Sequence, residues 1–469
     1  MGPQFNKLVR INPSKDGEIV PDLTTALPEQ PDGTTYIFRL TPNVLFSNGT
    51  AVTAEDVKAN YEWMLSPPKG KVSSRQSILA PVIDKVEVVD ATTVRFKLKY
   101  PSASFLINQT PEFLAIGPKA VLVADGDLSK NPIGSGPFIK KSYTPGVSYE
   151  LERNPKYFKS ELPYLDGIVI HIIADRRTVL EQFFTGALHM LGTGGASVPE
   201  KTEISGRMKD AVMVDTAVNL RNVLFMLSDS GPFKDPRARQ ALSLACDRND
   251  HLLLVNQGRG TPVGGYMAPS PAGQWALSPE EIKTIPGYGK ADLTQAKQLL
   301  SAAGVAEGTE VKFVNRSGAT NLDLTTYLVE QLRKLGLKAN TQILDSAAAY
   351  AAGAAGNFQL LPWATFPALD DPDAVFGDIG SQTGSVRNWG RYEDKSLDDL
   401  YAKQSQSLDA KERRKLVNEL DKKHLSGFAT INLGFASATF TQTKAVKNKF
   451  YHQNEHFTNR QFDTVWLDA

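Results

Sequence analysis

The segment 310–344 has the pattern of a β-α-β unit, and this pattern constrains the fold more than any other part of the chain. A strand-like run, EVKFVN (310–315), precedes a helical pattern from about Asp323 to Leu335. Gly336 suits the left-handed end of that helix, and a second strand-like run, LKANTQIL (337–344), follows it. Strands joined through a helix pair in parallel, and such crossovers are right-handed. The sequence therefore predicts an α/β fold.

Strand and helix signals alternate along the rest of the chain. Alternating apolar and polar residues predict strands at 34–40, 84–90 and 92–99. The last two strands are joined by a short turn at Ala91 and Thr92, which predicts a hairpin. Helix starts are marked by side chains that can accept a backbone N–H, namely Thr53, Asp235 and Asp292. At about 100–200 residues per domain, the 469 residues of the chain predict about two to four domains.

Composition and charge exclude several classes of protein. The 52 Lys and Arg residues balance 51 Asp and Glu residues, so no basic surface for nucleic acid is indicated. No apolar run reaches the length of a membrane span. Cys246 is the one cysteine, which excludes an intrachain disulfide and a multi-cysteine zinc site. The first 18 residues lack a charged start followed by an apolar core, so the chain as given carries no signal peptide.

The sequence His452-Gln453-Asn454-Glu455-His456 matches the H-x-x-E-H pattern of some zinc peptidases. That chemistry needs a helix, which places both imidazoles on one metal ion and leaves the glutamate to move a proton. The flanking residues lack a helical stripe of apolar side chains, and no third ligand is marked. A zinc hydrolase using His452, Glu455 and His456 therefore stays an alternative, and a solvated or ligand-facing loop is the favoured interpretation.

An acidic run bracketed by aromatic residues is the strongest sign of a binding site. Asp370, Asp371 and Asp373 lie within four positions, and the sequence places Trp363, Phe366, Trp389 and Tyr392 on either side of them. Aromatic walls with a few polar groups are typical of a cleft that binds an organic solute. A turn with helix capping at Asp373 is the alternative explanation of the acidic run.

Several segments, taken together and in order, resemble the extracellular oligopeptide- and dipeptide-binding proteins of ABC importers. The strand, turn and helix of YIFRLTPNVLFSNGTAVTAEDVKANYEWM (36–64) resemble a signature of that family. NPIGSGPF (131–138) resembles its Gly-Thr-Gly-Pro-Tyr turn, with Ser135 and Phe138 as departures. The resemblance continues through LERNPKYF, LPYLDGIVIHIIAD, GPFKDPRARQALSLACDRND, KADLTQAKQLLSAAGV, GNFQLLPW, DDPDAVF and RNWGRYEDKSLDDLYAKQ.

The resemblance implies a two-lobed periplasmic-binding-protein-like fold with a cleft and a hinge, plus an additional mixed α/β domain. The motifs map residues 1–30 with 141–222 and 445–469 to the first lobe, 31–140 to the extra domain, and 223–444 to the second lobe. The lobes of such a protein close over a solute and hand it to a membrane permease, with no bond made or broken. We expect a monomer without a metal or cofactor. We expect it in the periplasm or at the cell surface, where a lipid anchor on the full-length form is one way of holding it.

The resemblance also indicates ligand-binding residues, which we predict to be Trp363, Phe366, Asp370, Arg387, Asn388 and Trp389. Peptide-binding members carry an aspartate a few residues after the tryptophan that matches Trp363, and it pairs with the amino terminus of the peptide. Phe366 stands three positions after Trp363 here, and Asp370 is a displaced substitute. An unpaired buried ammonium is costly, so a non-peptide solute such as a sugar or an opine is an alternative.

Family chains usually open with a leader and a first strand before the segment that matches FNKLVRI, and only four residues precede that segment here. From the resemblance we expect that restoring upstream residues raises the melting temperature. A further alternative function is an interaction module, such as a sensor subunit that docks on a signalling receptor.

Overall fold

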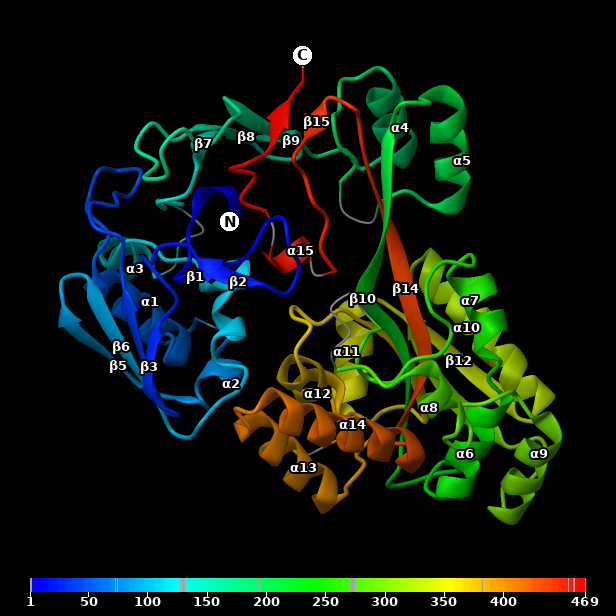
Figure 1. The fold of residues 1–469 in the computed structure, drawn as a ribbon. Helices are drawn as coiled ribbons and strands as arrows, with labels where there is room; N and C mark the ends of the chain where they lie inside the picture. Colours follow the sequence, from blue (N-terminus) through cyan, green and yellow to red (C-terminus); the bar gives the residue numbers. More distant parts are fainter. Residues whose placement is uncertain are drawn as a thin grey trace. The chain divides into compact units, whose positions relative to one another are not determined.

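A computed structural model shows an α/β protein whose chain forms two compact units (Figure 1). Unit 1 comprises Met1–Thr216 and Thr439–Ala469, and unit 2 comprises Ala217–Ala438. The structure describes residues 2–71, 73, 75–126, 128, 131–192, 195–269, 275–381, 383–453, 455–458 and 460–468, without the side chains of 77, 125, 319, 320, 455 and 456. Within this described part of the chain, none of the helices has the length and apolar character that a membrane crossing requires.

Unit 2 is built on a five-stranded sheet with the strand order β12-β11-β13-β10-β14. Its strands are β10 (Val212–Met226), β11 (Glu310–Arg316), β12 (Lys338–Leu344), β13 (Leu360–Thr365) and β14 (Thr430–Gln442). β11 pairs in parallel with both β12 and β13, whereas β13 pairs antiparallel with β10. The chain passes between the two units within β10 and within β14, which are neighbours in this sheet.

The predicted β-α-β unit is confirmed. β11 and β12 run parallel from the pair Glu310 and Lys338 to the pair Arg316 and Leu344, joined by α10 (Ala319–Lys334). The helix begins four residues before the predicted start. Gly318 precedes it with a φ of 114° and without a side-chain cap, so the sequence carries no start signal at this position. Gly336 has a φ of 80°, as a residue that ends a helix in the left-handed region requires.

The other helices of unit 2 begin mostly at aspartate or serine caps. The Asp235 side chain accepts the backbone N–H of Arg237, and Asp292 accepts that of Gln295. α10 packs on β11 and β12, α6 and α7 pack on α10, and α13 packs along α14. The helices are α6 (Pro236–Ala245), α7 (Arg248–Val255), α8 (Pro279–Lys283), α9 (Leu293–Ala302), α11 (Ser346–Ala355), α12 (Pro372–Ile379), α13 (Lys395–Gln406) and α14 (Ala410–Gly427).

Unit 1 contains several small sheets instead of one large sheet. The predicted hairpin is confirmed, since β5 (Ile83–Asp90) pairs antiparallel with β6 (Thr93–Leu98) across Ala91 and Thr92. The order β3-β4-β6-β5 is completed by β3 (Glu29–Asp32) and β4 (Thr35–Arg39). Further strands are β1 (Val9–Ile11) with β2 (Ile19–Pro21), β7 (Phe138–Thr144) with β8 (Ser148–Arg153) and β9 (Gly167–His171), and β15 (Val446–Lys447) with β16 (Trp466–Leu467).

The helices of unit 1 are short, and α1 packs on β5 and β6 (Figure 1). The carboxylate of Asp56 accepts the backbone N–H of Thr53 at 2.9 Å, which forms the capping box at the start of α1. The helices are α1 (Ala54–Leu65), α2 (Gln76–Leu79), α3 (Lys119–Asp125), α4 (Arg176–Phe184), α5 (Val198–Arg207) and α15 (Glu455–Thr458), with short 3₁₀ turns at Gly2–Gln4, Ile107–Gln109 and Glu112–Leu114.

Candidate functional site

Two tryptophans meet in unit 2 near the carboxyl ends of parallel strands. Trp363 lies on β13 opposite Val223 of β10, and its ring meets the edge of Trp389 with a centroid distance of 4.8 Å and an interplanar angle of 89°. Trp363 is 7% exposed and Trp389 is 5% exposed. Edge-to-face contact is a favourable geometry for aromatic rings, so the two indoles hold each other in fixed positions.

Helix α11 completes this aromatic cluster. The ring of Tyr350 lies 5.2 Å from that of Trp389 and 6.3 Å from that of Trp363. The helix approaches so closely that a Cβ added to Gly353 would lie 2.7 Å from Cε3 of Trp389. Glycine is therefore needed at this position of α11 for the helix to close on the indole.

Two arginines lie against the two tryptophans. Cζ of Arg316, the last residue of β11, is 3.9 Å from the ring centroid of Trp363, and Cζ of Arg387 is 5.9 Å from that of Trp389. Both distances fit a cation–π contact. Burial lowers the pKa of Arg316, and the charge of Arg387 lowers it further, so the two guanidinium groups are near enough to repel each other.

Sequence reasoning found Trp363, Arg387 and Trp389, which the structure brings together, but it missed Arg316. A signal for Arg316 was present, because it directly follows the predicted strand 310–315, which the structure extends to Arg316. Ligands of open α/β sheets bind outside the carboxyl ends of the strands. A charged side chain at such a strand end is a candidate ligand contact on that ground.

The predicted site residues Asp370, Phe366 and Asn388 take different positions. Burial lowers the pKa of the fully buried Arg221 to about 10, and the charge of Asp370 acts against that shift, so Asp370 interacts with this guanidinium. Asn388 donates to the carbonyls of Ser381 and Tyr392 at 3.2 and 2.8 Å, which closes its own loop. Phe366 is half-buried, one residue beyond β13.

A pocket of about 770 Å³ opens beside Trp389. Tyr350, Asn388 and Trp389 contribute to its wall. Charged groups of both signs complete the wall, namely Asp229, Lys234, Arg239, Arg391 and Glu393. The pocket is large enough for a small organic molecule and combines aromatic and charged walls, as binding sites for such molecules do.

A buried polar cluster lies on the face of α14 that packs against α12. The carboxylate of Asp421 accepts the backbone N–H of Tyr266 at 2.9 Å, and burial raises its pKa to about 6. His424 stacks on Phe376 with a centroid distance of 5.2 Å, and burial lowers its pKa to about 3. Both groups are therefore biased toward their neutral forms.

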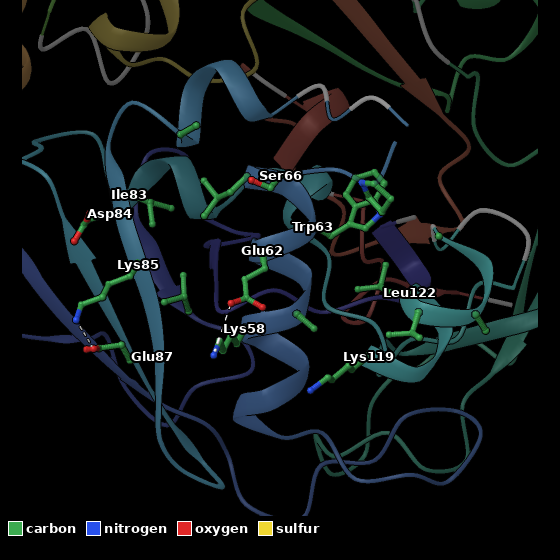
Figure 2. Close-up of a pocket in the computed structure, with 18 of the residues that line it drawn as sticks. Lys58, Glu62, Trp63, Ser66, Ile83, Asp84, Lys85, Glu87, Lys119 and Leu122 are labelled. Atoms are coloured by element: carbon green, nitrogen blue, oxygen red, sulfur yellow. Dashed lines mark ion pairs between the residues drawn. The ribbon is translucent and has the colours of Figure 1, made fainter. Parts of the chain in front are cut away.

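Unit 1 has a larger pocket of about 1230 Å³, which Figure 2 shows between α1, β5 and α3. Four of its charged side chains form two ion pairs within the wall: Lys58 lies 3.7 Å from Glu62, and Lys85 lies 2.6 Å from Glu87. Lys119, which also lines the pocket, pairs with Glu55 at 3.0 Å, and Lys99 donates to the backbone carbonyl of Ala80 at 2.8 Å. Each lysine that lines this pocket thus has a partner within unit 1.

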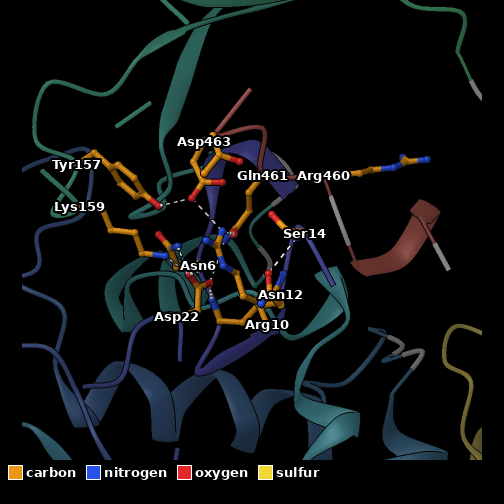
Figure 3. Close-up of polar contacts among 12 residues, drawn as sticks. Asn6, Arg10, Asn12, Ser14, Asp22, Tyr157, Lys159, Arg460, Gln461 and Asp463 are labelled. Atoms are coloured by element: carbon orange, nitrogen blue, oxygen red, sulfur yellow. Dashed lines mark hydrogen bonds and ion pairs between the residues drawn. The ribbon is translucent and has the colours of Figure 1, made fainter. Parts of the chain in front are cut away.

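A second charged group in unit 1 has a structural role (Figure 3). Asp22 accepts from Lys159 and from the Asn6 side chain at 2.9 and 2.8 Å, and Arg10 pairs with Asp463 at 2.9 Å. Burial alone would raise the pKa of Asp22, but the nearby cations outweigh it and hold the pKa well below its usual range. These bonds join the start of the chain to segments 157–159 and 461–463.

The zinc pattern falls partly outside the described residues, because the side chains of Glu455 and His456 are not among them. His452 is buried, and its Nε2 lies 3.0 Å from the carbonyl oxygen of Pro13. α15 begins at Glu455, so His452 is not on the same helix as the other two residues. Among the side chains that are described, no three His, Cys, Asp or Glu residues are grouped as metal ligands.

Comparison with known proteins identifies relatives that bind solutes. The chain is 24% identical to di/tripeptide-binding protein 2 of Pseudomonas aeruginosa over 451 residues, which is 89% of this chain and 81% of that protein. It is 30% identical to the oligopeptide-binding protein AppA of Bacillus subtilis over 349 residues, which is 70% of this chain and 61% of the relative. The second match thus spans less than two thirds of that relative's length.

A solved structure agrees in fold with the whole chain. The periplasmic binding protein AgaA of A. tumefaciens R10, in complex with agropinic acid, superposes with a TM-score of 0.82 at 23% identity, covering 100% of this chain and 93% of AgaA. The two-lobed periplasmic-binding-protein-like fold class is thereby confirmed, and the zinc hydrolase alternative gains no support from any of these relatives. The sequence model of the bacterial extracellular solute-binding proteins, family 5 Middle, matches residues 18–386, and the chain belongs to this family.

Proposed function

We propose that this chain is a non-catalytic receptor that binds a small organic solute outside the cytoplasm and delivers it to the membrane permease of an ABC importer. The observation that carries the proposal is the family match over residues 18–386, together with the cluster of Trp363, Trp389 and Arg316 at one sheet edge. A solute held at the carboxyl ends of β11 and β13 would lie where open α/β sheets bind their ligands.

The names of the relatives suggest the class of solute. One relative is a di/tripeptide-binding protein, another is an oligopeptide-binding protein, and AgaA was solved with agropinic acid, an opine. We therefore propose a short peptide or an opine-like organic acid as the solute. The receptor acts as a monomer, without a metal or cofactor and without binding nucleic acid.

Within the proposed site, Trp363, Arg387 and Trp389 contact the solute, and Phe366, Asp370 and Asn388 fix the loops around them. We propose the domain boundaries 1–30 with 141–222 and 445–469 for the first lobe, 31–140 for the extra domain, and 223–444 for the second lobe. The two indoles support the site assignment because their mutual contact preorganises them before a solute arrives.

Mass spectrometry of the purified chain, first native and then denatured, tests the proposal. A receptor that retains its solute shows a native mass above that of the chain and releases a small molecule on denaturation. The same preparation is then washed free of solute in mild denaturant, refolded and titrated with di- and tripeptides and with agropinic acid. A chain that releases no small molecule and binds none of these probes would contradict the receptor function.

A further inference from the structure

The pocket of about 770 Å³ in unit 2 lies by the amino end of β13, away from the carboxyl ends where the solute site is proposed. β10 and β13 are antiparallel, and Arg221 pairs with Thr365 at one end of the two strands while Met226 pairs with Leu360 at the other. Asp229 of the pocket wall comes shortly after Met226 in the chain. At about 3.3 Å per residue, this end of β13 is about 17 Å from its carboxyl end.

The wall of this pocket has an excess of positive charge. Arg391 and Asp229 form an ion pair at 3.1 Å, so their charges compensate each other. Among the described residues, no carboxylate forms an ion pair with Lys234 or Arg239, which also line the pocket. Glu393, at an exposed position, is the other carboxylate of the wall. Three cations thus stand against two carboxylates.

Arg239 lines the pocket but is itself buried, with 5% of its surface exposed. Its guanidinium donates to the carbonyls of Phe233, Lys234 and Phe428 at 2.9, 2.9 and 3.1 Å. Its Cζ lies 5.5 Å from the ring centroid of Tyr392. These acceptors fix the side chain and satisfy donors without cancelling its charge, and an arginine stays protonated in proteins. A buried charge of this kind attracts an anion more strongly than a cation in open water does.

Aromatic side chains supply an apolar surface beside these cations. Tyr350 is 42% exposed, and its ring stands edge to face on that of Trp389 at an interplanar angle of 88°. Val386, which is also exposed, and Tyr392 line the same pocket. Exposed apolar side chains that gather in a concave surface mark sites of interaction, and aromatic walls suit a flat organic molecule.

We propose that this pocket is a second binding site, separate from the solute site, and that it takes a small organic acid. The flat apolar part of the acid lies against Tyr350 and Trp389, and its carboxylate is attracted by Lys234 and Arg239. The inference goes beyond the proposed receptor function, since the solute of that function binds at the opposite end of the sheet. Trp389 contributes to both sites, because its ring also meets that of Trp363.

Matched probes test the chemistry of the site. Phenylacetate, its neutral amide phenylacetamide and the cation phenethylamine share one aromatic ring and differ in charge. Isothermal titration calorimetry measures their binding to the full chain after it has been washed free of solute. We expect phenylacetate to bind at least tenfold more tightly than either of the other two probes.

Substitutions place the bound probe in this pocket. Ala354 lies at an exposed position of α11 in the pocket wall, so A354W should fill the space and weaken phenylacetate binding at least tenfold. A351W adds the same bulk at an exposed position of α11 outside the wall and should bind like the native chain. K234E should also weaken binding at least tenfold, whereas K297E makes the same charge change on α9 and should not. Circular dichroism shows whether each variant is folded.

A further variant separates this inference from the receptor function. R316Q changes the cluster at the carboxyl ends of the strands and should leave phenylacetate binding unchanged. If R316Q abolishes binding while A354W does not, phenylacetate occupies the solute site, so the second site is wrong and the receptor function stands. The second site is equally wrong if phenylacetate does not bind, or binds no more tightly than its amide. Binding that A354W and K234E remove supports the second site, whether or not the purified chain releases a solute.

Discussion

Arg413 and Asp371 form a bidentate ion pair in which each terminal guanidinium nitrogen donates to one carboxylate oxygen at 2.9 Å, and both side chains are 4% exposed. Asp371 also accepts the backbone N–H of Asp373 at 2.9 Å and thereby caps α12. One carboxylate thus ties α14 to the start of α12, directly after the loop that follows β13.

Replacing Arg413 with methionine is expected to lower the free energy of unfolding by about 3–5 kcal/mol, because it leaves the Asp371 carboxylate buried without its cation. Urea denaturation measures the loss. The double variant R413M/D371N should lose less than the sum of the single variants, since the uncompensated charge is then gone. R333M, which breaks the exposed pair with Glu330, should stay within about 1 kcal/mol of the native chain. An R413M variant as stable as R333M would contradict this account.

Replacing Gly353 with alanine is expected to destabilise the protein by about 1–3 kcal/mol, because the new methyl group would overlap Trp389. The matched control is Gly206→Ala near the end of α5, where nothing lies within 4 Å of the added Cβ. That variant should be unchanged or more stable by up to about 1 kcal/mol, since alanine favours helix over glycine. Thermal unfolding of both variants compares them, and equal effects would show that α11 does not depend on close contact with the indole.

His424 is expected to make the protein less stable in acid. Neither of its ring nitrogens has a hydrogen-bond partner among the described residues, and burial lowers its pKa to about 3. An unfolded histidine titrates near 6.5, so the unfolded state binds more protons as the pH falls from 6.5 towards 3, and stability is lost over that range. Asp421 acts in the opposite direction, since its pKa of about 6 means that its contribution is present in acid and lost as the pH rises through 6.

The variant His424→Phe tests this dependence, because phenylalanine keeps the stack on Phe376 without a titrating group. Relative to the native chain, the variant should gain stability as the pH is lowered from 7 to 4, by up to about 1.4 kcal/mol per pH unit. Urea denaturation at each pH gives the difference. A difference between H424F and the native chain that stays constant with pH would contradict the assignment.

Replacing Asp22 with asparagine is expected to cost about 3–5 kcal/mol, because Lys159 and Arg10 lose a buried carboxylate partner. The pKa of Asp22 lies below its usual range, so its contribution is present above about pH 4 and is lost as the pH falls below that value. Asp166→Asn, in the exposed pair with Arg153, should cost less than about 1 kcal/mol. Unfolding at pH 7 separates the two variants, and equal losses would show that Asp22 is not a structural anchor.

Those parts of the fold that depend on local sequence were predictable. The β-α-β unit and the hairpin at Ala91 and Thr92 follow from periodicity and turn residues within short segments. The early start of α10 was missed, because Gly318 offers no side-chain cap and hence no start signal. Local chemistry therefore fixed the type of each element better than its boundaries.

The candidate site was only partly predictable, because its chemistry depends on residues far apart in the sequence. The aromatic residues around 363 and 389 stood out, but Asp370, in the loop after β13, interacts with Arg221 on β10. Arg316 was missed because what marks it as a candidate site residue is its contact with Trp363, and this contact depends on the pairing of β11 with β13. No pattern within one segment carries that information.

The two crossings of the chain within β10 and β14 have a consequence for biosynthesis. Unit 2 is one continuous stretch, Ala217–Ala438, so all of it can emerge from the ribosome while later residues are still being added. Unit 1 needs Thr439–Ala469 as well as Met1–Thr216, so it is completed only when translation has passed beyond the inserted unit. The segment Met1–Thr216 is thus synthesised first, but its unit is completed last. During synthesis this segment lacks the chain from Thr439 on, which is made more than two hundred residues later.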